Sequence, residues 1–487
     1  MASPLSELRK IRLEKLNALK SQGIDAYPSF TRRTHTASEA LNSLDKKVII
    51  VGRLSSLRSH GKIVFGDVAD QSGQIQILFK SDSLPDKIFE NVALLDIGDF
   101  VEVEGLVFVT KAGQTTVDVK EYKILAKSLL PIPGEYYGLT DIETRLRKRY
   151  LDILTNPEVK QIFIKKNKFW SAIREYLVKN DFLELEMPIL ENIPGGAEAE
   201  PFVTHHNALD RDFYLRISLE LPLKKMLVAG YERVFEIGRI FRNEGIDSEH
   251  LQDYSQMEFY WAYSDFNSLM DFITRMYQEV ISKTFGTLQF DRDGQTVDWS
   301  GEWKKLDYLE LFLQYTGLDL NTVSDDELFD YAKKNKIVYE KSAGRGRIID
   351  LIFKKKIRTL PEVSLQPAFL INPPIEIEPL AKKNSNNPKT VQRMQILAFG
   401  SELGKGFGEL NDPIDQRERF ENQMKLREKG DMEAQMIDED YIEAMEYGMP
   451  PSAGFGVSER LFSVLMGLPI RETVIFPLMK DQKNETD

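Results

Sequence analysis

Apolar and charged residues alternate along several short segments in the second half of the chain, and this alternation limits the folds available to it. The segments FLELEMPIL, RVFEIGRIFRNE and YSQMEFYWAYSD follow it. Since successive side chains of a strand point to opposite faces, such a segment has one apolar face and one polar face. One solvated face is typical of antiparallel sheets, whereas parallel strands are buried on both faces. We therefore predict an antiparallel sheet flanked by helices in an α+β fold.

The chain has 487 residues, too many for one ordinary core, and its patterns change along its length. Between residues 47 and 126, five short alternating segments separated by glycine and aspartate turns predict a five-stranded OB-fold β-barrel, a fold that commonly binds oligonucleotides. We expect the following parts: a basic N-terminal helix (1–30), the OB-fold domain (45–133), a hinge (134–160), and a larger domain (161–482) whose sheet is interrupted by a helical insertion at about 265–360.

The composition excludes several classes of protein. The formal net charge is −12, so a nucleic-acid partner would have to bind a local basic patch. The chain contains no cysteine, which excludes disulfides and cysteine-ligated zinc and suits a reducing compartment such as the cytoplasm. No run of about 18 apolar residues occurs, so we expect no membrane partner. The first 20 residues predict a basic amphipathic helix, for which packing and RNA contact are equally open interpretations.

The segment FRNEGIDSEHLQDYSQMEFY (241–260) places large aromatic residues beside charged ones. On a strand, residues two apart share a face, so Arg242 and Glu244 point together, as do Glu258 and Tyr260. If the two halves pair as a hairpin, these four side chains converge on one concave surface while the intervening apolar residues form core. The alternative is an exposed sheet with solvated ion pairs.

Two glycine-rich segments further along the chain favour a binding site. GSELGKGFGELND carries Glu402 and Glu409, and SAGFGVSERL places Arg460 at the predicted start of a helix. Glycines allow the backbone to approach a ligand closely, and an arginine at a helix start suits phosphate. No GxxxxGK[ST] loop is present, which excludes a Walker-type nucleotide fold. The segment AGRGRIID (343–350) is interpreted as a turn between two helices.

With these motifs, the chain resembles the class II lysyl-tRNA synthetases of the bacterial type over essentially its whole length. KNDFLELEMPIL is similar to the family's first motif, around Pro188, FRNEGIDSEH to the second, around Arg242, and GFGVSERL to the third, around Arg460. IPGGAEAEPFVTHHNALD and GFGELND resemble the lysine branch specifically. The resemblance implies a homodimeric ligase whose larger domain (161–482) is catalytic. Such an enzyme forms lysyl-adenylate from L-lysine and ATP, and then transfers lysine to the terminal adenosine of tRNA(Lys).

The resemblance also implies roles for individual residues. Those expected to bind ATP are Arg242, Glu244, His250, Tyr254, Glu402 and Arg460, and the expected catalytic pair is Arg242 and Arg460. Those expected to bind lysine are Gly195, Gly196, Glu220, Glu258, Tyr260, Lys405, Phe407 and Glu409. The expected ligands of the implied cofactor, Mg²⁺, are Glu402, Gln395 and Glu409. Those expected to read the tRNA anticodon are Arg58, Phe65, Gln76 and Glu121.

The residue types agree with the implied chemistry. Activation joins an amino-acid carboxylate to the α-phosphate of ATP, and that carboxylate is already ionised at neutral pH, so no general base is required. The site has to position the reactants and neutralise phosphate charge, which two arginines can do. A lysine ammonium group taken out of water needs carboxylates around it, and the segments above supply them.

Four positions depart from the residues that are usual in the family, and one of them is Tyr254, where phenylalanine is usual. Gln395 offers a neutral oxygen where an acidic metal ligand is usual, Glu249 replaces an arginine near the γ-phosphate, and Lys405 replaces an asparagine. Our hypothesis is that Lys405 restores part of the missing positive charge. Two other functions are considered: a lysyl transferase that modifies a protein, against which the barrel argues, and a catalytically silent RNA-binding protein, against which the retained charged residues argue.

Overall fold

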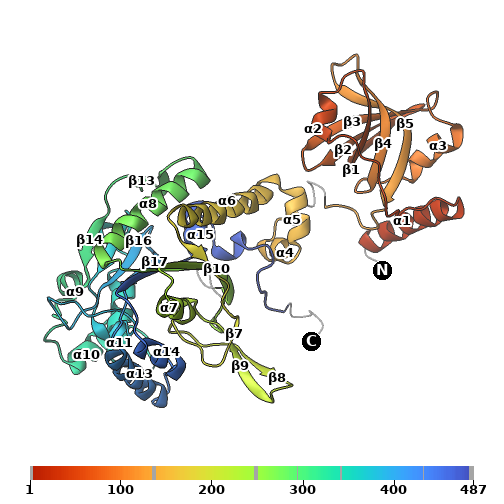
Figure 1. Cartoon of the computed structure of the whole chain (residues 1–487). Helices are drawn as coiled ribbons and strands as arrows, with labels where there is room; N and C mark the ends of the chain where they lie inside the picture. Colours follow the sequence, from red (N-terminus) through yellow and green to blue (C-terminus); the bar gives the residue numbers. More distant parts are fainter. Residues whose placement is uncertain are drawn as a thin grey trace. The chain divides into compact units, whose positions relative to one another are not determined.

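The computed structural model describes residues 4–133, 139–245, 251–292, 294–340, 343–431 and 433–481. The chain divides into two compact units (Figure 1). The first comprises residues 1–145 with 150–155, and the second comprises residues 146–149 with 156–487. Within the described ranges, no helix has the length and apolar character needed to cross a membrane.

The first unit is built on a closed five-stranded barrel, as predicted. Its strands follow the order β1-β2-β3-β5-β4. They are β1 (Lys47–His60), β2 (Ile63–Asp70), β3 (Gly73–Lys80), β4 (Phe100–Val109) and β5 (Thr115–Ala126). Alternate residues such as Val101 and Val103 point inward and are fully buried. Short helices, α2 (Ala37–Leu41) and α3 (Asp86–Glu90), lie outside the barrel, and η1 (Asn91–Leu94) follows α3.

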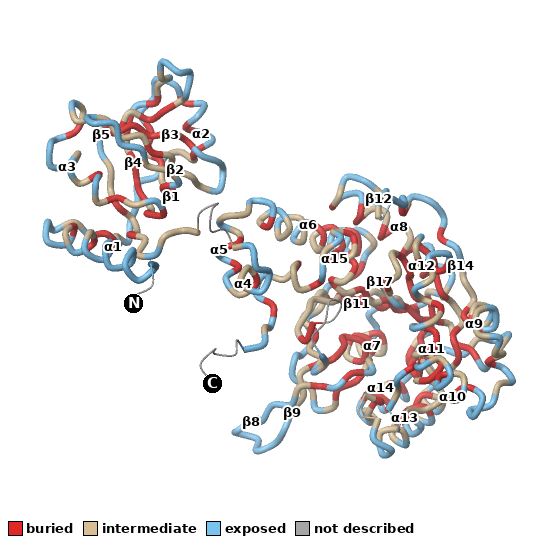
Figure 2. The backbone as a smooth tube through the Cα atoms, turned by 180° about the vertical axis from the view of Figure 1, so that it is seen from behind, coloured by how far each residue is buried: buried red, intermediate tan, exposed pale blue. Residues whose placement is uncertain are grey.

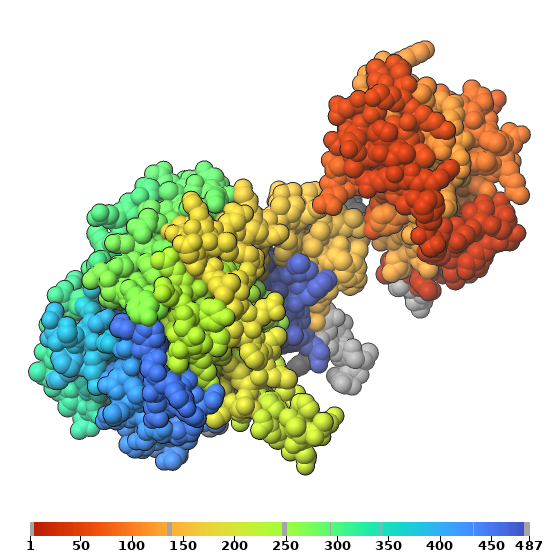
Figure 3. Space-filling model, in the orientation of Figure 1, coloured from red at the N-terminus to blue at the C-terminus, as the bar shows by residue number. Residues whose placement is uncertain are grey.

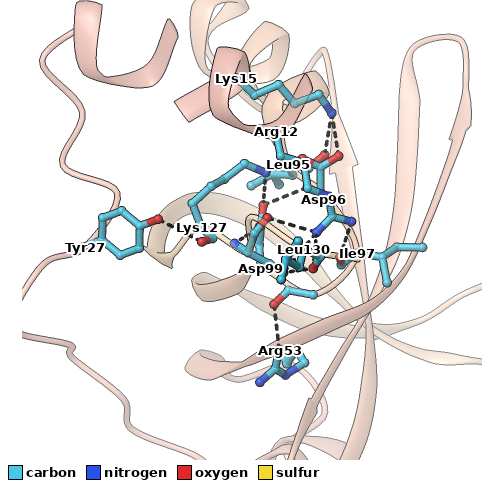
Figure 4. Close-up of polar contacts among 12 residues, drawn as sticks. Arg12, Lys15, Tyr27, Arg53, Leu95, Asp96, Ile97, Asp99, Lys127 and Leu130 are labelled. Atoms are coloured by element: carbon cyan, nitrogen blue, oxygen red, sulfur yellow. Dashed lines mark hydrogen bonds and ion pairs between the residues drawn. The ribbon is translucent and has the colours of Figure 1, made fainter. Parts of the chain in front are cut away.

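Helix α1 (Pro4–Ser21) packs against the barrel, which favours the packing interpretation of the basic N-terminal segment. Leu16 and Leu19 enter the barrel core. The buried Arg12 guanidinium donates hydrogen bonds to the carbonyl oxygens of Ser128 (3.0 Å), Leu130 (3.1 Å) and Ile97 (3.0 Å), as Figure 4 shows in part. Arg12 is therefore a structural residue. The other basic residues of α1 point to solvent or, in the case of Lys15 with Asp96, to the barrel surface.

The second unit contains an eight-stranded sheet, β14-β15-β16-β17-β18-β11-β10-β6. The central strands are β10 (Arg233–Phe241), β11 (Asp253–Ala262), β15 (Ala368–Ile371), β16 (Arg393–Ala398), β17 (Ser401–Gly408) and β18 (Ser452–Ser458). All of these pair antiparallel, as predicted. The end strands, β14 (Lys304–Asp307) and β6 (Leu183–Glu184), pair parallel with their neighbours.

The two faces of this sheet have different partners. One face packs on α6 (Pro157–Lys179), α8 (Phe266–Phe285) and α15 (Arg460–Met466), with Met257 and Phe259 in the core between them. On the other face, Tyr260 packs with residues of α7 (Glu220–Val228), α13 (Pro413–Glu428) and α14 (Glu439–Glu446). Buried segments accordingly concentrate in the middle of the unit (Figure 2). The predicted alternation of faces along residues 257–260 is thus present, but the solvated face that it suggested is wrong here, because all four residues are buried.

The stretch at 265–360 is mainly helical but also contributes strands. It contains α8, α9 (Tyr308–Thr316), α10 (Asp325–Lys334) and α11 (Arg345–Lys356), the hairpin β12 (Gln289–Arg292) and β13 (Gln295–Asp298), and β14. A capping box begins α10, where Ser324 and Glu327 exchange hydrogen bonds. Because β14 pairs with β15, this stretch extends the main sheet as well as interrupting it.

The remaining elements are short. They are α4 (Ile142–Arg147), α5 (Arg149–Thr155), α12 (Pro361–Ser364), η3 (Ile375–Ile377), η4 (Ile470–Thr473), β7 (Leu190–Glu191), β8 (Val203–His206) and β9 (Arg211–Leu215). The β8–β9 hairpin projects from the body of the second unit (Figure 3).

Candidate functional site

A cavity of about 790 Å³ opens in the second unit beside strands β11, β17 and β18. It brings together most of the residues that the sequence analysis assigned to one site. Those that line it are Gly196, Glu220, Arg242, Glu244, Tyr254, Glu258, Tyr260, Gln395, Glu402, Lys405, Phe407 and Arg460. Gly195 and Glu409 lie behind this lining, and His250 and Glu249 lie outside the described residues.

Arg242 and Glu244 reach the cavity in a different way from the one predicted. Strand β10 ends at Phe241, so both residues belong to the loop that follows it and do not share a strand face. The backbone N–H of Arg242 still donates to the carbonyl oxygen of Gln252 (2.8 Å), which extends the hairpin by one residue. The Arg242 guanidinium lies 5.7 Å from the centre of the Tyr254 ring. The predicted hairpin between β10 and β11 is present, with Phe241 opposite Asp253.

Glu258 is the most heavily bonded carboxylate of the cavity. Its Oε1 accepts hydrogen bonds from Ser218 Oγ (2.8 Å), the Leu219 N–H (3.0 Å) and Gln256 Nε2 (2.5 Å). Its Oε2 accepts one from the Tyr260 hydroxyl (2.8 Å). The side chain is 3% exposed, and four donors satisfy most of its acceptor capacity. This network fixes the carboxylate and the tyrosine in one orientation, as a binding site requires.

A second acidic group lies behind Gly454 of β18. The Nζ of Lys224 lies 2.5 Å from Glu220 Oε1 and also forms an ion pair with Glu409 Oε2. All three side chains are buried, and Lys224 has no exposed surface. Burial raises the pKa of the Glu220 and Glu409 carboxyl groups, and the Lys224 ammonium group opposes that rise. The two acids are among the residues predicted from the sequence, whereas Lys224 is not.

Gly196 shows why glycine occupies the cavity wall at this point. Its φ is +83°, and a Cβ atom there would lie 2.8 Å from the Cβ of Glu220 and 2.9 Å from that of Ser218. A residue with a side chain would be strained by the left-handed backbone, and its Cβ atom would be too close to Glu220 and Ser218. Gly195 has a different role, because a Cβ atom there would meet Leu221 rather than the cavity.

Each of the three residues that were predicted to bind Mg²⁺ lies beside a cationic side chain. Gln395 Oε1 accepts a hydrogen bond from Arg393 (2.5 Å), and Glu402 lies 3.5 Å from Arg358. Glu409 pairs with Lys224 rather than joining Glu402. Among the described residues, no group of three acidic or histidine side chains could hold a metal ion. The residues present therefore fit an ion that takes one carboxylate from Glu402 and its other ligands from a phosphate substrate and water.

Lys405 is engaged within the cavity. Its Nζ lies 3.1 Å from Glu378 Oε2 and 5.1 Å from the centre of the Phe407 ring. The Nε of Arg393 lies 3.5 Å from the same oxygen of Glu378. The hypothesis that Lys405 compensates for Glu249 stays a prediction, since Glu249 lies outside the described residues.

The segment AGRGRIID is more than the predicted turn. Residues from Arg345 onward form the first turns of α11, and this end of the helix lines the cavity. Arg345 bonds to Asp325 (2.8 Å), which anchors the helix, and Arg347 pairs with Glu433 (2.8 Å) across the cavity wall. The arginines and glycines of the segment are the sequence feature that could have indicated its place in the cavity wall. The sequence did not show that the segment begins a helix beside the other motifs.

A separate group of polar and aromatic side chains lies on the barrel of the first unit. Arg58 of β1 is paired with Phe65 of β2, and Gln76 of β3 is paired with Asp67 of β2, so they share one outer face. Phe65 is partly buried but is not part of the barrel core. Gln76 Oε1 accepts a hydrogen bond from Thr116 (2.8 Å), which leaves its amide nitrogen on this face.

Glu121 stands apart from this group. It lies on β5, is exposed, and pairs with Arg32 at 3.1 Å. The structure therefore brings three of the four predicted anticodon residues onto neighbouring strands and places the fourth beside an arginine from the segment before the barrel.

Comparisons with known proteins cover both units. Residues 141–480 match the family described as tRNA synthetases class II (D, K and N), and residues 48–129 match the OB-fold nucleic acid binding domain. Among curated proteins, the lysine–tRNA ligase of Thermoanaerobacter pseudethanolicus is 42% identical, over 99% of this chain and 97% of its own length. That of Carboxydothermus hydrogenoformans is 43% identical over 98% of each chain, and that of Bacillus subtilis 39% over 98% of each chain.

Proposed function

The chain belongs to the class II tRNA synthetases, in the lysine–tRNA ligase branch, and on that premise we propose that the cavity of its second unit is where lysine and ATP react. As an ATP-dependent ligase of this branch, it joins lysine to tRNA. The observation that carries the site assignment is the cluster of buried carboxylates, Glu220, Glu258 and Glu409, beside a cavity that also holds Arg242 and Arg460.

The carboxylates suit a substrate with two ammonium groups. Glu220 and the glycine backbone at Gly196 would receive the α-amino group. Glu409, Glu258 and the Tyr260 hydroxyl would receive the side-chain ammonium. Lys405 and Phe407 line the same cavity. Because an uncharged side chain would bring no positive charge to balance these buried carboxylates, the site should reject it strongly.

The arginines suit the nucleotide. Arg242 would bridge the lysine carboxylate and the α-phosphate, Tyr254 would stack on adenine, Glu244 would accept from its amino group, and Arg460 would hold the γ-phosphate end. These groups act by positioning and by neutralising charge, so no proton acceptor is needed. Mg²⁺ would enter with ATP and take Glu402 as a protein ligand, where it would neutralise phosphate charge; the neutral oxygen of Gln395 is a weaker ligand.

The barrel face of Arg58, Phe65 and Gln76 is the proposed anticodon site, because an aromatic ring can stack on a base while an amide reads its edge. We further propose a homodimer in the cytoplasm. The segment around Pro188 supports the dimer, since Leu183, Ile189 and Leu190 are each about half exposed there. An apolar surface of this kind suits a subunit interface.

Glu409→Gln tests the lysine site. It removes one charge next to the proposed ammonium position, so we expect the KM for lysine in ATP/pyrophosphate exchange to rise by about 100-fold, while the KM for ATP changes less than about threefold. Glu421→Gln, on the exposed side of α13, is the matched control and should change neither constant. An unchanged lysine KM in the Glu409 variant would place the substrate elsewhere.

A further inference from the structure

We propose that Lys224 is a specificity-determining residue: its buried ammonium group sets the charge of the lysine pocket to the value that two substrate ammonium groups neutralise. This inference rests on the proposed assignment of Glu220, Glu258 and Glu409 to the substrate. It concerns a residue that does not line the cavity but lies directly behind its wall.

Lys224 pairs with Glu220 and Glu409, the two of the three pocket acids that receive the fewest hydrogen bonds from other groups. Glu258 accepts four hydrogen bonds, whereas Glu220 and Glu409 are held mainly by Lys224. The ammonium group also lies 5.7 Å from the centre of the Tyr260 ring, whose π face favours a cation. Lys224 thus contacts three side chains of the proposed lysine pocket: Glu220, Glu409 and Tyr260.

The charge count follows from these residues. With all three acids ionised, three carboxylates and one ammonium give this group a net charge of −2. Burial raises the pKa of Glu220 to about 7 and that of Glu409 to about 8, so the incoming substrate ammonium groups have to take the place of protons on these acids. Burial raises the pKa of Tyr260 and Tyr441, the phenols that face Lys224, so both remain neutral. Glu378 is paired separately with two cations, Lys405 and Arg393, and is not part of this count. L-Lysine brings two ammonium groups, while Arg242 matches its carboxylate. The sum over bound lysine, Arg242, Lys224 and the three carboxylates is therefore zero, and such a balance favours buried charges.

Removing Lys224 alone should disturb this balance. The pocket would hold three buried carboxylates against two incoming charges, and one acid would have to stay protonated. Removing Lys224 and one acid together restores a charge of −2. Charge balance therefore predicts that the two substitutions compensate for one another. If both losses were merely structural, their free-energy costs would add and their effects on the lysine KM would multiply.

The test is a double-mutant cycle of Lys224→Met and Glu409→Gln, with lysine KM, ATP KM and kcat measured by ATP/pyrophosphate exchange. We expect Lys224→Met to raise the lysine KM by about 30-fold or more with little change in the ATP KM. We expect the double variant to have a lower lysine KM than either single variant. Lys225→Met is the matched control, because the neighbouring Lys225 pairs with Asp440 outside the cavity, and it should leave all constants unchanged.

The outcomes separate this inference from the proposed function. If the wild-type protein shows lysine-dependent exchange but Lys224→Met keeps its lysine KM, or if the double variant is worse than both single variants, the inference is wrong. If Lys224→Met does not fold by circular dichroism, the double variant carries the test: a folded protein with a lysine KM below that of Glu409→Gln supports charge balance, and any other result overturns it. If Glu409→Gln leaves the lysine KM unchanged, the proposed site itself is refuted.

Discussion

Gly454 of β18 lies opposite Tyr260 of β11 and in front of Glu409, and we expect Gly454→Ala to disable lysine binding selectively. A Cβ atom at this position would lie 2.5 Å from Cδ1 of Tyr260 and closer still to Glu409 Oε1. Ordinary contacts between carbon atoms are about 3.5–4.0 Å, so one or both side chains would have to move by about 1 Å. Both belong to the proposed lysine pocket.

The size of the effect follows from that displacement. A misplacement of about 1 Å in a catalytic site can cost about 100-fold in rate, which corresponds to about 2.7 kcal/mol of transition-state stabilisation. Overpacking of this kind also lowers the free energy of unfolding by about 1–3 kcal/mol. We therefore expect kcat/KM for lysine to fall by about 100-fold, while the protein still folds at 25 °C.

The assay is ATP/pyrophosphate exchange with lysine and ATP varied in turn, together with urea denaturation. Gly456→Ala provides the control on the same strand, because the nearest atom to its Cβ would be Glu258 Cγ at 3.3 Å and the next contacts lie at 3.8 Å. That variant should lose less than about threefold in kcat/KM. Equal effects of the two substitutions, or an unchanged lysine KM in Gly454→Ala, would refute the placement of the pocket.

Three further predictions concern other parts of the molecule. Arg242→Lys should lower kcat for exchange by about 100-fold or more, because a lysine cannot replace a bidentate guanidinium between a carboxylate and a phosphate. Phe65→Ala should weaken tRNA binding by about 1–3 kcal/mol, measured as the tRNA KM in aminoacylation, while exchange without tRNA stays unchanged. Arg12→Met removes hydrogen bonds to three carbonyl oxygens and should destabilise the first unit by about 2–4 kcal/mol in urea denaturation, again without an effect on exchange.

The parts of the fold that the sequence predicted are those set by local pattern. The alternation of Met257 and Phe259 with Glu258 and Tyr260 fixed which face of β11 meets the core, because the period of a strand is two residues wherever the strand lies. The five barrel strands followed from the same rule. The similarity of several segments to motifs of the synthetase family then predicted that residues distant in sequence would lie in one cavity.

The parts that the sequence missed depend on contacts between distant segments. Lys224 and Lys225 are adjacent on one helix and look alike in sequence, yet one is buried between two acids and the other is paired at the surface. The difference arises because Glu409, far along the chain, is brought beneath α7 only in the folded sheet. The sequence also did not show that β10 ends before Arg242, because the end of a strand depends on how it pairs with its neighbours and not on the alternation of residues.

The most direct test of the central claim is ATP/pyrophosphate exchange with each of the twenty amino acids, measured on the full chain with and without tRNA. A cavity with buried carboxylates beside two arginines predicts exchange with lysine and, at most, trace exchange with any uncharged amino acid. Exchange that is driven equally well by an uncharged or acidic amino acid would contradict the account of how this cavity selects its substrate.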